Sequence, residues 1–149
     1  MITFDIGKLS TMSHVNNHKT IFLIEDDEDD QQFFTDALRE ITDTTLFGIA
    51  NNGKEALEKL ANSTILPDII FTDIHMPVMN GIECLTQLRS NPRTENIAVV
   101  ILSSASQHIE IATSLHVTTY IIKPPGSQLL RDKIEHAINL ALVPQKSLF

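Results

Sequence analysis

Five short apolar runs divide the chain, and a segment with helical periodicity follows each of them. The first run, Ile21-Phe22-Leu23-Ile24, contains no polar position, which is typical of a strand buried on both faces of a parallel sheet. The run over 97–102 is the most apolar of the five. The pattern predicts strands over residues 21–24, 45–50, 69–72, 97–102 and 118–122.

The segments after these runs predict helices. Apolar residues from Phe33 to Ile41 recur at helical spacing, so we expect a helix over 28–41 whose acidic first turn suits the helix dipole. A turn at Asn51-Asn52-Gly53 precedes a second amphipathic segment that ends near Ala61. Three more helices are predicted over residues 81–90, 107–115 and 128–142.

Strands that alternate with helices favour an α/β fold with helices on both faces of a parallel sheet. For five strands we expect the flavodoxin-like, doubly wound (βα)5 arrangement with strand order 2-1-3-4-5. One such domain would span residues 19–142, between a flexible arm over 1–18 and a loose tail over 143–149. Ligands of this fold bind at the carboxyl ends of strands beside the switch point, so functional residues should follow Ile24 and Thr72.

Polar residues stand at these strand ends. Glu25 and Asp26 follow the first strand, Asp73 the third, Ser103 the fourth and Lys123 the fifth. Two carboxylates about 4 Å apart repel by roughly 4 kcal/mol at an effective dielectric of about 20, so such a cluster needs a cation or bound protons. Oxygen ligands favour Mg²⁺, which pairs with phosphate oxygens. The set therefore predicts phosphoryl transfer onto a carboxylate.

Each of these residues also has an ordinary interpretation. A single Asp after a strand is usually a helix N-cap, a Lys-Pro pair is usually a turn, and Ser103-Ser104 is typical of a polar loop. The acid run from Glu25 to Asp30 can be a solvated face. Placement at four of five strand ends is what favours a functional site.

Composition narrows the class of protein. The 149 residues are 42% hydrophobic and 20% charged, with a net charge of −8, so we expect no direct contact with nucleic acid. We expect no membrane span, because an apolar run of about 18 residues is missing, and no secretory signal at the N-terminus. Cys84 is the single cysteine, which fits a reducing compartment, and the expected location is the cytoplasm.

Five segments in order resemble the receiver domain of two-component response regulators, over roughly residues 19–142. The absence of an output domain makes the chain similar to stand-alone, chemotaxis-regulator-like members. The residues at positions 26–30 and 103–104 are similar to those of the phytochrome-associated type. The segments that carry the resemblance are Ile21 to Asp27, Asn52 to Leu57, Asp73 to Gly81, Val100 to Ser104 and Tyr120 to Pro124.

The resemblance implies a phosphoacceptor and a metal site. Asp73 is the implied phosphoacceptor. Asp26 would bind Mg²⁺, or alternatively Mn²⁺, directly, and Glu25 would bind it through water. The backbone carbonyl of His75 would be the third contact. A pair at Asp26-Asp27 is the alternative register, but the pair in this family follows the last strand residue immediately, which favours Glu25-Asp26.

The resemblance also implies a switch. Lys123 would bind the phosphoryl group, Ser103 would be the switch hydroxyl and Tyr120 the aromatic residue that moves with it. Lys123-Pro124 resembles a cis peptide of the family. The side chain of His75 and the residue Ala105 are candidate modulators of the phosphoaspartate lifetime. Pro124-Pro125-Gly126 is stiffer than the usual sequence, and we expect it to reshape the start of the last helix.

The implied function is that of a signalling protein. A sensor histidine kinase or histidine phosphotransfer protein would donate the phosphoryl group, and the face of the fourth helix, fifth strand and fifth helix would contact a downstream protein or a second copy of the chain. The chain would catalyse only its own phosphotransfer and dephosphorylation. Two alternatives are a pseudo-receiver docking module and a haloacid-dehalogenase-type phosphatase. The latter needs a second Asp where His75 stands.

Overall fold

The computed structural model describes residues 18–141, and within them five parallel strands form one sheet in the order β2-β1-β3-β4-β5. Both the fold class and the strand order predicted from the sequence are confirmed. The strands are β1 (Lys19–Ile24), β2 (Thr44–Ala50), β3 (Ile69–Thr72), β4 (Ala98–Ser103) and β5 (Thr119–Ile122). The helices are α2 (Glu28–Arg39), α3 (Gly53–Ala61), α4 (Gly81–Arg89), α5 (Ile109–Ser114) and α6 (Ser127–Ala141).

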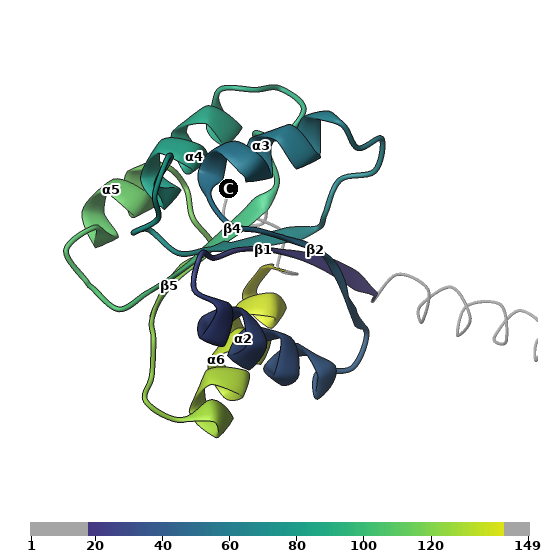
Figure 1. Ribbon diagram of the computed structural model, residues 1–149, viewed down its shortest axis with the longest axis vertical. Helices are drawn as coiled ribbons and strands as arrows, with labels where there is room; N and C mark the ends of the chain where they lie inside the picture. The colour runs from purple at the N-terminus through teal and green to yellow at the C-terminus, as the bar shows by residue number, and fades with distance from the viewer. Residues whose placement is uncertain (1–17, 142–149) are drawn as a thin grey trace, which may run out of the picture.

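The sheet lies between two layers of helices (Figure 1), with α2 and α6 on one face and α3, α4 and α5 on the other. Successive strand residues enter different cores. Ile21 and Leu23 pack in the core that contains Phe34 of α2, whereas Phe22 and Ile24 pack in the core that contains Leu85 of α4. Burial on both faces explains why the central strands have continuous apolar runs instead of alternating ones.

Cys84 belongs to the core beneath α3 and α4. It is fully buried, and burial raises the pKa of its thiol to about 12. The thiol is therefore protonated and unreactive at neutral pH in the folded protein.

Several element boundaries differ from the prediction. Helix α2 ends at Arg39, although Ile41 beyond it is still buried. Helix α5 has only six residues, because residues up to His108 form a turn and His108 caps the helix without a side-chain hydrogen bond. Apolar periodicity does not distinguish a short helix from a turn that buries the same side chains.

The proposed arm over 1–18, apart from His18, and the proposed tail over 143–149 lie outside the described residues. The domain limits therefore remain a prediction. Among residues 18–141, the helices are all too short or too polar to cross a lipid bilayer.

Candidate metal and phosphoacceptor site

The strand order brings the carboxyl ends of β1 and β3 together. Ile24 pairs with Thr72, and Asp73 N donates a hydrogen bond to Ile24 O at 3.0 Å. Glu25, Asp26 and Asp73 each offer a carboxylate oxygen, and these oxygens all lie within 4.8 Å of one another. Three acids that are up to 48 positions apart in the sequence thus converge at one edge of the sheet, as the strand-end pattern predicted.

The acids differ in their exposure to solvent. The side chain of Glu25 is 3% exposed and that of Asp73 12% exposed, whereas Asp26 lies at the surface. The pKa of Glu25 is raised to about 7: burial and the charge of Asp73 raise it, and a hydrogen bond from Lys123 opposes them. An oxygen-only donor set with one buried and one exposed carboxylate fits Mg²⁺, which keeps several of its waters when bound.

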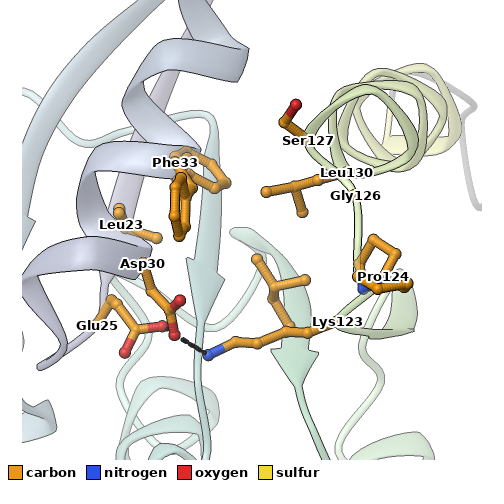
Figure 2. Close-up of a pocket in the computed structure, with 12 residues that line it drawn as sticks. Leu23, Glu25, Asp30, Phe33, Lys123, Pro124, Gly126, Ser127 and Leu130 are labelled. Carbon is orange, nitrogen blue, oxygen red and sulfur yellow. Dashed lines mark hydrogen bonds and ion pairs between the residues drawn. The ribbon is translucent and has the colours of Figure 1, made fainter.

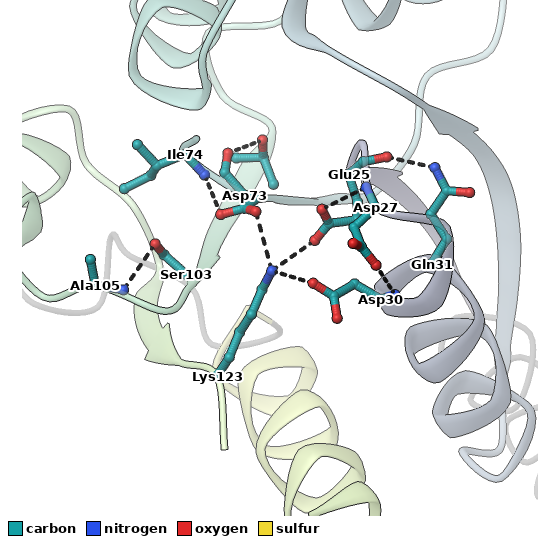
Figure 3. A network of polar contacts seen from close by, with 10 residues as sticks. Glu25, Asp27, Asp30, Gln31, Asp73, Ile74, Ser103, Ala105 and Lys123 are labelled. Atoms are coloured by element: carbon teal, nitrogen blue, oxygen red, sulfur yellow. Dashed lines mark hydrogen bonds and ion pairs between the residues drawn. The ribbon is translucent and has the colours of Figure 1, made fainter. Parts of the chain in front are cut away.

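Lys123 supplies the cation of the site. Figure 3 shows its Nζ atom among three carboxylates, at 2.9 Å from Glu25 Oε1, 3.1 Å from Asp73 Oδ2 and 2.8 Å from Asp30 Oδ2. Burial lowers the pKa of Lys123, but the hydrogen bonds to Asp30 and Glu25 and the charge of Asp73 outweigh it and raise this pKa above its ordinary value. The ammonium is therefore charged at any physiological pH.

Asp30 was not singled out by the sequence. In the sequence, Asp30 is one of several acids in the first turn of a predicted helix, where any carboxylate interacts favourably with the helix dipole. A contact with a lysine 93 positions away leaves no local signal in the sequence. Only the tertiary structure brings the two together.

Asp27, which belongs to the alternative metal-binding pair Asp26-Asp27, caps the N-terminus of α2. Its Oδ1 accepts a hydrogen bond from Asp30 N at 2.9 Å, and its own N–H donates to Glu25 Oε2 at 3.2 Å. Asp27 does not belong to the acid group that could hold a metal among the described residues. The geometry therefore favours the Glu25-Asp26 register.

The backbone around Asp73 holds its carboxylate in place. Ile74 N donates to Asp73 Oδ1 at 2.7 Å, while Lys123 contacts Oδ2. Helix α4 begins directly against this turn, where Gly81 N donates to Ile74 O at 2.9 Å. A Cβ atom on Gly81 would lie 2.0 Å from the carbonyl oxygen of Asp73, so only glycine allows this approach.

Hydrogen bonds to Ala105 join the two residues of the predicted switch, Ser103 and Tyr120. Ser103 is fully buried, and its Oγ accepts a hydrogen bond from Ala105 N at 3.3 Å. The hydroxyl of Tyr120 donates to the carbonyl oxygen of Ala105. Lys123 N donates to Ser103 O at 2.8 Å, which joins these residues to the acid cluster.

His75 is exposed, and its ring lies edge-to-face against that of His108, with centroids 5.2 Å apart. His108 comes from the loop between β4 and α5 and was not singled out by the sequence. The predicted roles of the His75 carbonyl and side chain remain predictions.

The predicted cis peptide at Lys123-Pro124 is wrong, because no cis peptide bond occurs among the described residues. The two isomers before proline differ by only about 0.5–1 kcal/mol, so local sequence does not decide between them.

Comparison with known proteins assigns the fold to a family. The family model of the response regulator receiver domain matches residues 21–135. The chain belongs to the response regulator receiver family. The receiver resemblance found in the sequence is thereby confirmed. Receiver domains in general are phosphorylated by histidine kinases and act on downstream targets.

Relatives of this receiver include stand-alone regulators and enzymes. It is 36% identical to the chemotaxis protein CheY1 of Helicobacter pylori, over 58% of the chain and 70% of CheY1. It is 32% identical to a probable cyclic di-GMP phosphodiesterase of Vibrio cholerae, over 77% of the chain and 25% of that enzyme. The chain thus spans about a quarter of the length of the first curated relatives it matches.

Among solved structures, the phosphorylated cyanobacterial phytochrome response regulator RcpA superimposes on this receiver with a TM-score of 0.75 at 30% identity. The superposition covers 84% of this chain and 94% of RcpA. The Mn²⁺-bound form of response regulator Rcp1 gives a TM-score of 0.73 at 26% identity, and covers 85% and 97% of the two chains.

Proposed function

We propose that this receiver is a phosphoacceptor switch, in which Asp73 takes a phosphoryl group from a phosphohistidine on a sensor histidine kinase or a histidine phosphotransfer protein. One observation carries the proposal: three acids converge at the ends of β1 and β3, and Lys123 contacts the carboxylate of Asp73. The likeness to a phosphorylated regulator, RcpA, supports it.

Glu25, Asp26 and Asp73 would hold Mg²⁺, or Mn²⁺ as in the solved form of Rcp1, with the backbone carbonyl of His75 as a further ligand. When bound, the ion supplies positive charge that offsets the repulsion between the carboxylates and an incoming phosphoryl group.

The chain's own residues position the nucleophile. The Ile74 N–H holds Asp73 Oδ1, which leaves Oδ2 beside the ammonium of Lys123. A bond forms from a carboxylate oxygen to phosphorus as the phosphorus–nitrogen bond of the donor breaks, and the departing imidazole keeps that electron pair. Lys123 stabilises the negative charge of the transferred oxygens. The protein catalyses only this transfer and the later hydrolysis.

Output would follow from the chain of hydrogen bonds at Ala105. A phosphoryl group on Asp73 would accept a hydrogen bond from the Ser103 hydroxyl, which would draw the loop after β4 towards the site. Tyr120 would then exchange its bond to Ala105 for a position nearer the site. This shifts a two-state equilibrium of the α5–β5–α6 face, which presents Ile109, Ile111 and Ile122 to a downstream protein or a second copy.

The proposal is tested by incubation with acetyl phosphate and Mg²⁺, followed by intact-protein mass spectrometry. Wild-type protein should gain one phosphoryl group, Asp73→Asn none, and Asp36→Asn, at an exposed position on α2, should match the wild type. Tyrosine fluorescence should change in parallel, since Tyr120 is the only tyrosine and tryptophan is absent.

Labelling of Asp73→Asn would refute Asp73 as the acceptor. A wild-type protein that takes up no phosphoryl group would contradict the proposal and indicate a pseudo-receiver that acts only as a docking module. Turnover of a small phosphate ester would instead indicate a phosphatase.

A further inference from the structure

The ion pair between Asp30 and Lys123 has no part in the mechanism proposed above. Asp30 lies in the first turn of α2, and its Oδ2 accepts a hydrogen bond from Lys123 Nζ at 2.8 Å. Its carboxylate is not one of the three that could hold a metal ion among the described residues. The contact therefore concerns the lysine and not the candidate metal site.

Lys123 has no free donor in this arrangement. An ammonium group carries three N–H bonds, and Glu25, Asp30 and Asp73 each accept one. A phosphoryl group on Asp73 takes over the hydrogen bond that the Asp73 carboxylate accepted, and gains a second one from Lys123 only when Glu25 or Asp30 releases it.

Asp30 is the carboxylate that is released at the lowest cost. Its side chain is 37% exposed, against 3% for Glu25, so water replaces the hydrogen bond that Asp30 loses. It also lies in the first turn of α2, where the helix dipole stabilises a negative charge without a partner.

A cavity beside the ion pair provides space for this movement. It has a volume of about 230 Å³ and lies between α2 and the start of α6 (Figure 2). Glu25, Asp30 and Lys123 are among its polar lining residues, and Phe33 and Leu130 are among its apolar ones. The Asp30 side chain therefore borders open space as well as the lysine.

We propose that Asp30 is a positioning residue that holds Lys123 in the unphosphorylated protein and competes with the phosphoryl group on Asp73 for its ammonium. The inference rests on the proposed function, because it assumes that an anion is bound at Asp73. The Asp30 carboxylate thus weakens anion binding at the acceptor, and phosphorylation releases a contact between α2 and the segment after β5.

The test is a titration with beryllofluoride, a stable analogue of a phosphoryl group on aspartate, at saturating Mg²⁺. Bound analogue is quantified by ¹⁹F NMR. Asp30→Asn removes the charge and keeps the size of the side chain, so it should lower the half-saturating concentration by about three- to fivefold. Asp30→Glu, which restores a carboxylate, should return it towards the wild-type value.

The matched control is Asp29→Asn, which removes the same charge from the same exposed helical turn at a residue that is not among the three partners of Lys123. An unchanged half-saturation is expected. Thermal melting of each variant confirms that α2 remains folded.

The inference fails if Asp30→Asn binds the analogue no more tightly than wild type, or if Asp29→Asn shows the same gain, which would indicate a general charge effect. Wild-type protein that does not bind the analogue at all would overturn the proposed function and this inference together. Wild-type binding without a gain in Asp30→Asn would overturn the inference alone.

Discussion

Burial of the Glu25 side chain raises the pKa of its carboxyl group. Its carboxyl group would be ionised at neutral pH in water, yet its pKa is about 7 beneath the edge of the sheet. Asp26, only one residue further, lies at the surface. The chain thus combines a buried acid, which is sensitive to pH and to charge, with an exposed acid that a solvated cation can reach.

The raised pKa of Glu25 makes metal binding dependent on pH. Mg²⁺ competes with the proton for this carboxylate, so the dissociation constant should rise as pH falls below about 7, by up to about tenfold per pH unit. Isothermal titration calorimetry between about pH 6 and pH 8 measures this dependence. Glu25→Gln should bind Mg²⁺ more weakly with a flatter profile. An unchanged dissociation constant in the wild type over this range would contradict the prediction.

At the scale of elements, helix termini position the acceptor. Asn80 and Glu83 form a capping box at the start of α4, and Gly81 brings this start against the carbonyl of Asp73. Asp73 directly follows the third predicted strand, so its position at the edge of the sheet was predictable. The close approach of α4 to the backbone of Asp73 was not predictable from the sequence, because it depends on how the helix packs.

Gly81→Ala should move the acceptor. The added Cβ would clash with the Asp73 carbonyl, so we expect a loss of about 1–3 kcal/mol in the free energy of unfolding and slower labelling by acetyl phosphate. Denaturant melts and the phosphorylation rate measure the two effects.

Gly126→Ala is the matched control, because a Cβ there meets no atom within 4 Å. It should be close to neutral in both measurements. Equal behaviour of the two variants would show that the approach of α4 to Asp73 is not as tight as described.

At the scale of the whole molecule, the site exists only in the folded chain. The acids come from two strands, the lysine from a third, and the order β2-β1-β3-β4-β5 places these strand ends along one edge. A ligand that binds this edge stabilises the fold, because the unfolded chain does not bring the acids together.

Mg²⁺ should therefore raise the unfolding free energy by about 2.7 kcal/mol at a concentration 100 times its dissociation constant. Thermal or denaturant melts with and without Mg²⁺ provide the measurement. Asp73→Asn should lose most of this gain. A gain of equal size in Asp73→Asn would place the ion elsewhere.

Local pattern alone determined the strands, their alternation with helices and the acids and lysine at the strand ends. These features depend on the periodicity of apolar residues and on the rule that functional residues of a doubly wound sheet follow the carboxyl ends of its strands, so they can be read from the sequence. Tertiary structure alone decided the Asp30 contact with Lys123, the His75–His108 pair and the trans peptide before Pro124. The two contacts join residues 93 and 33 positions apart, and such contacts depend on packing rather than on neighbouring residues.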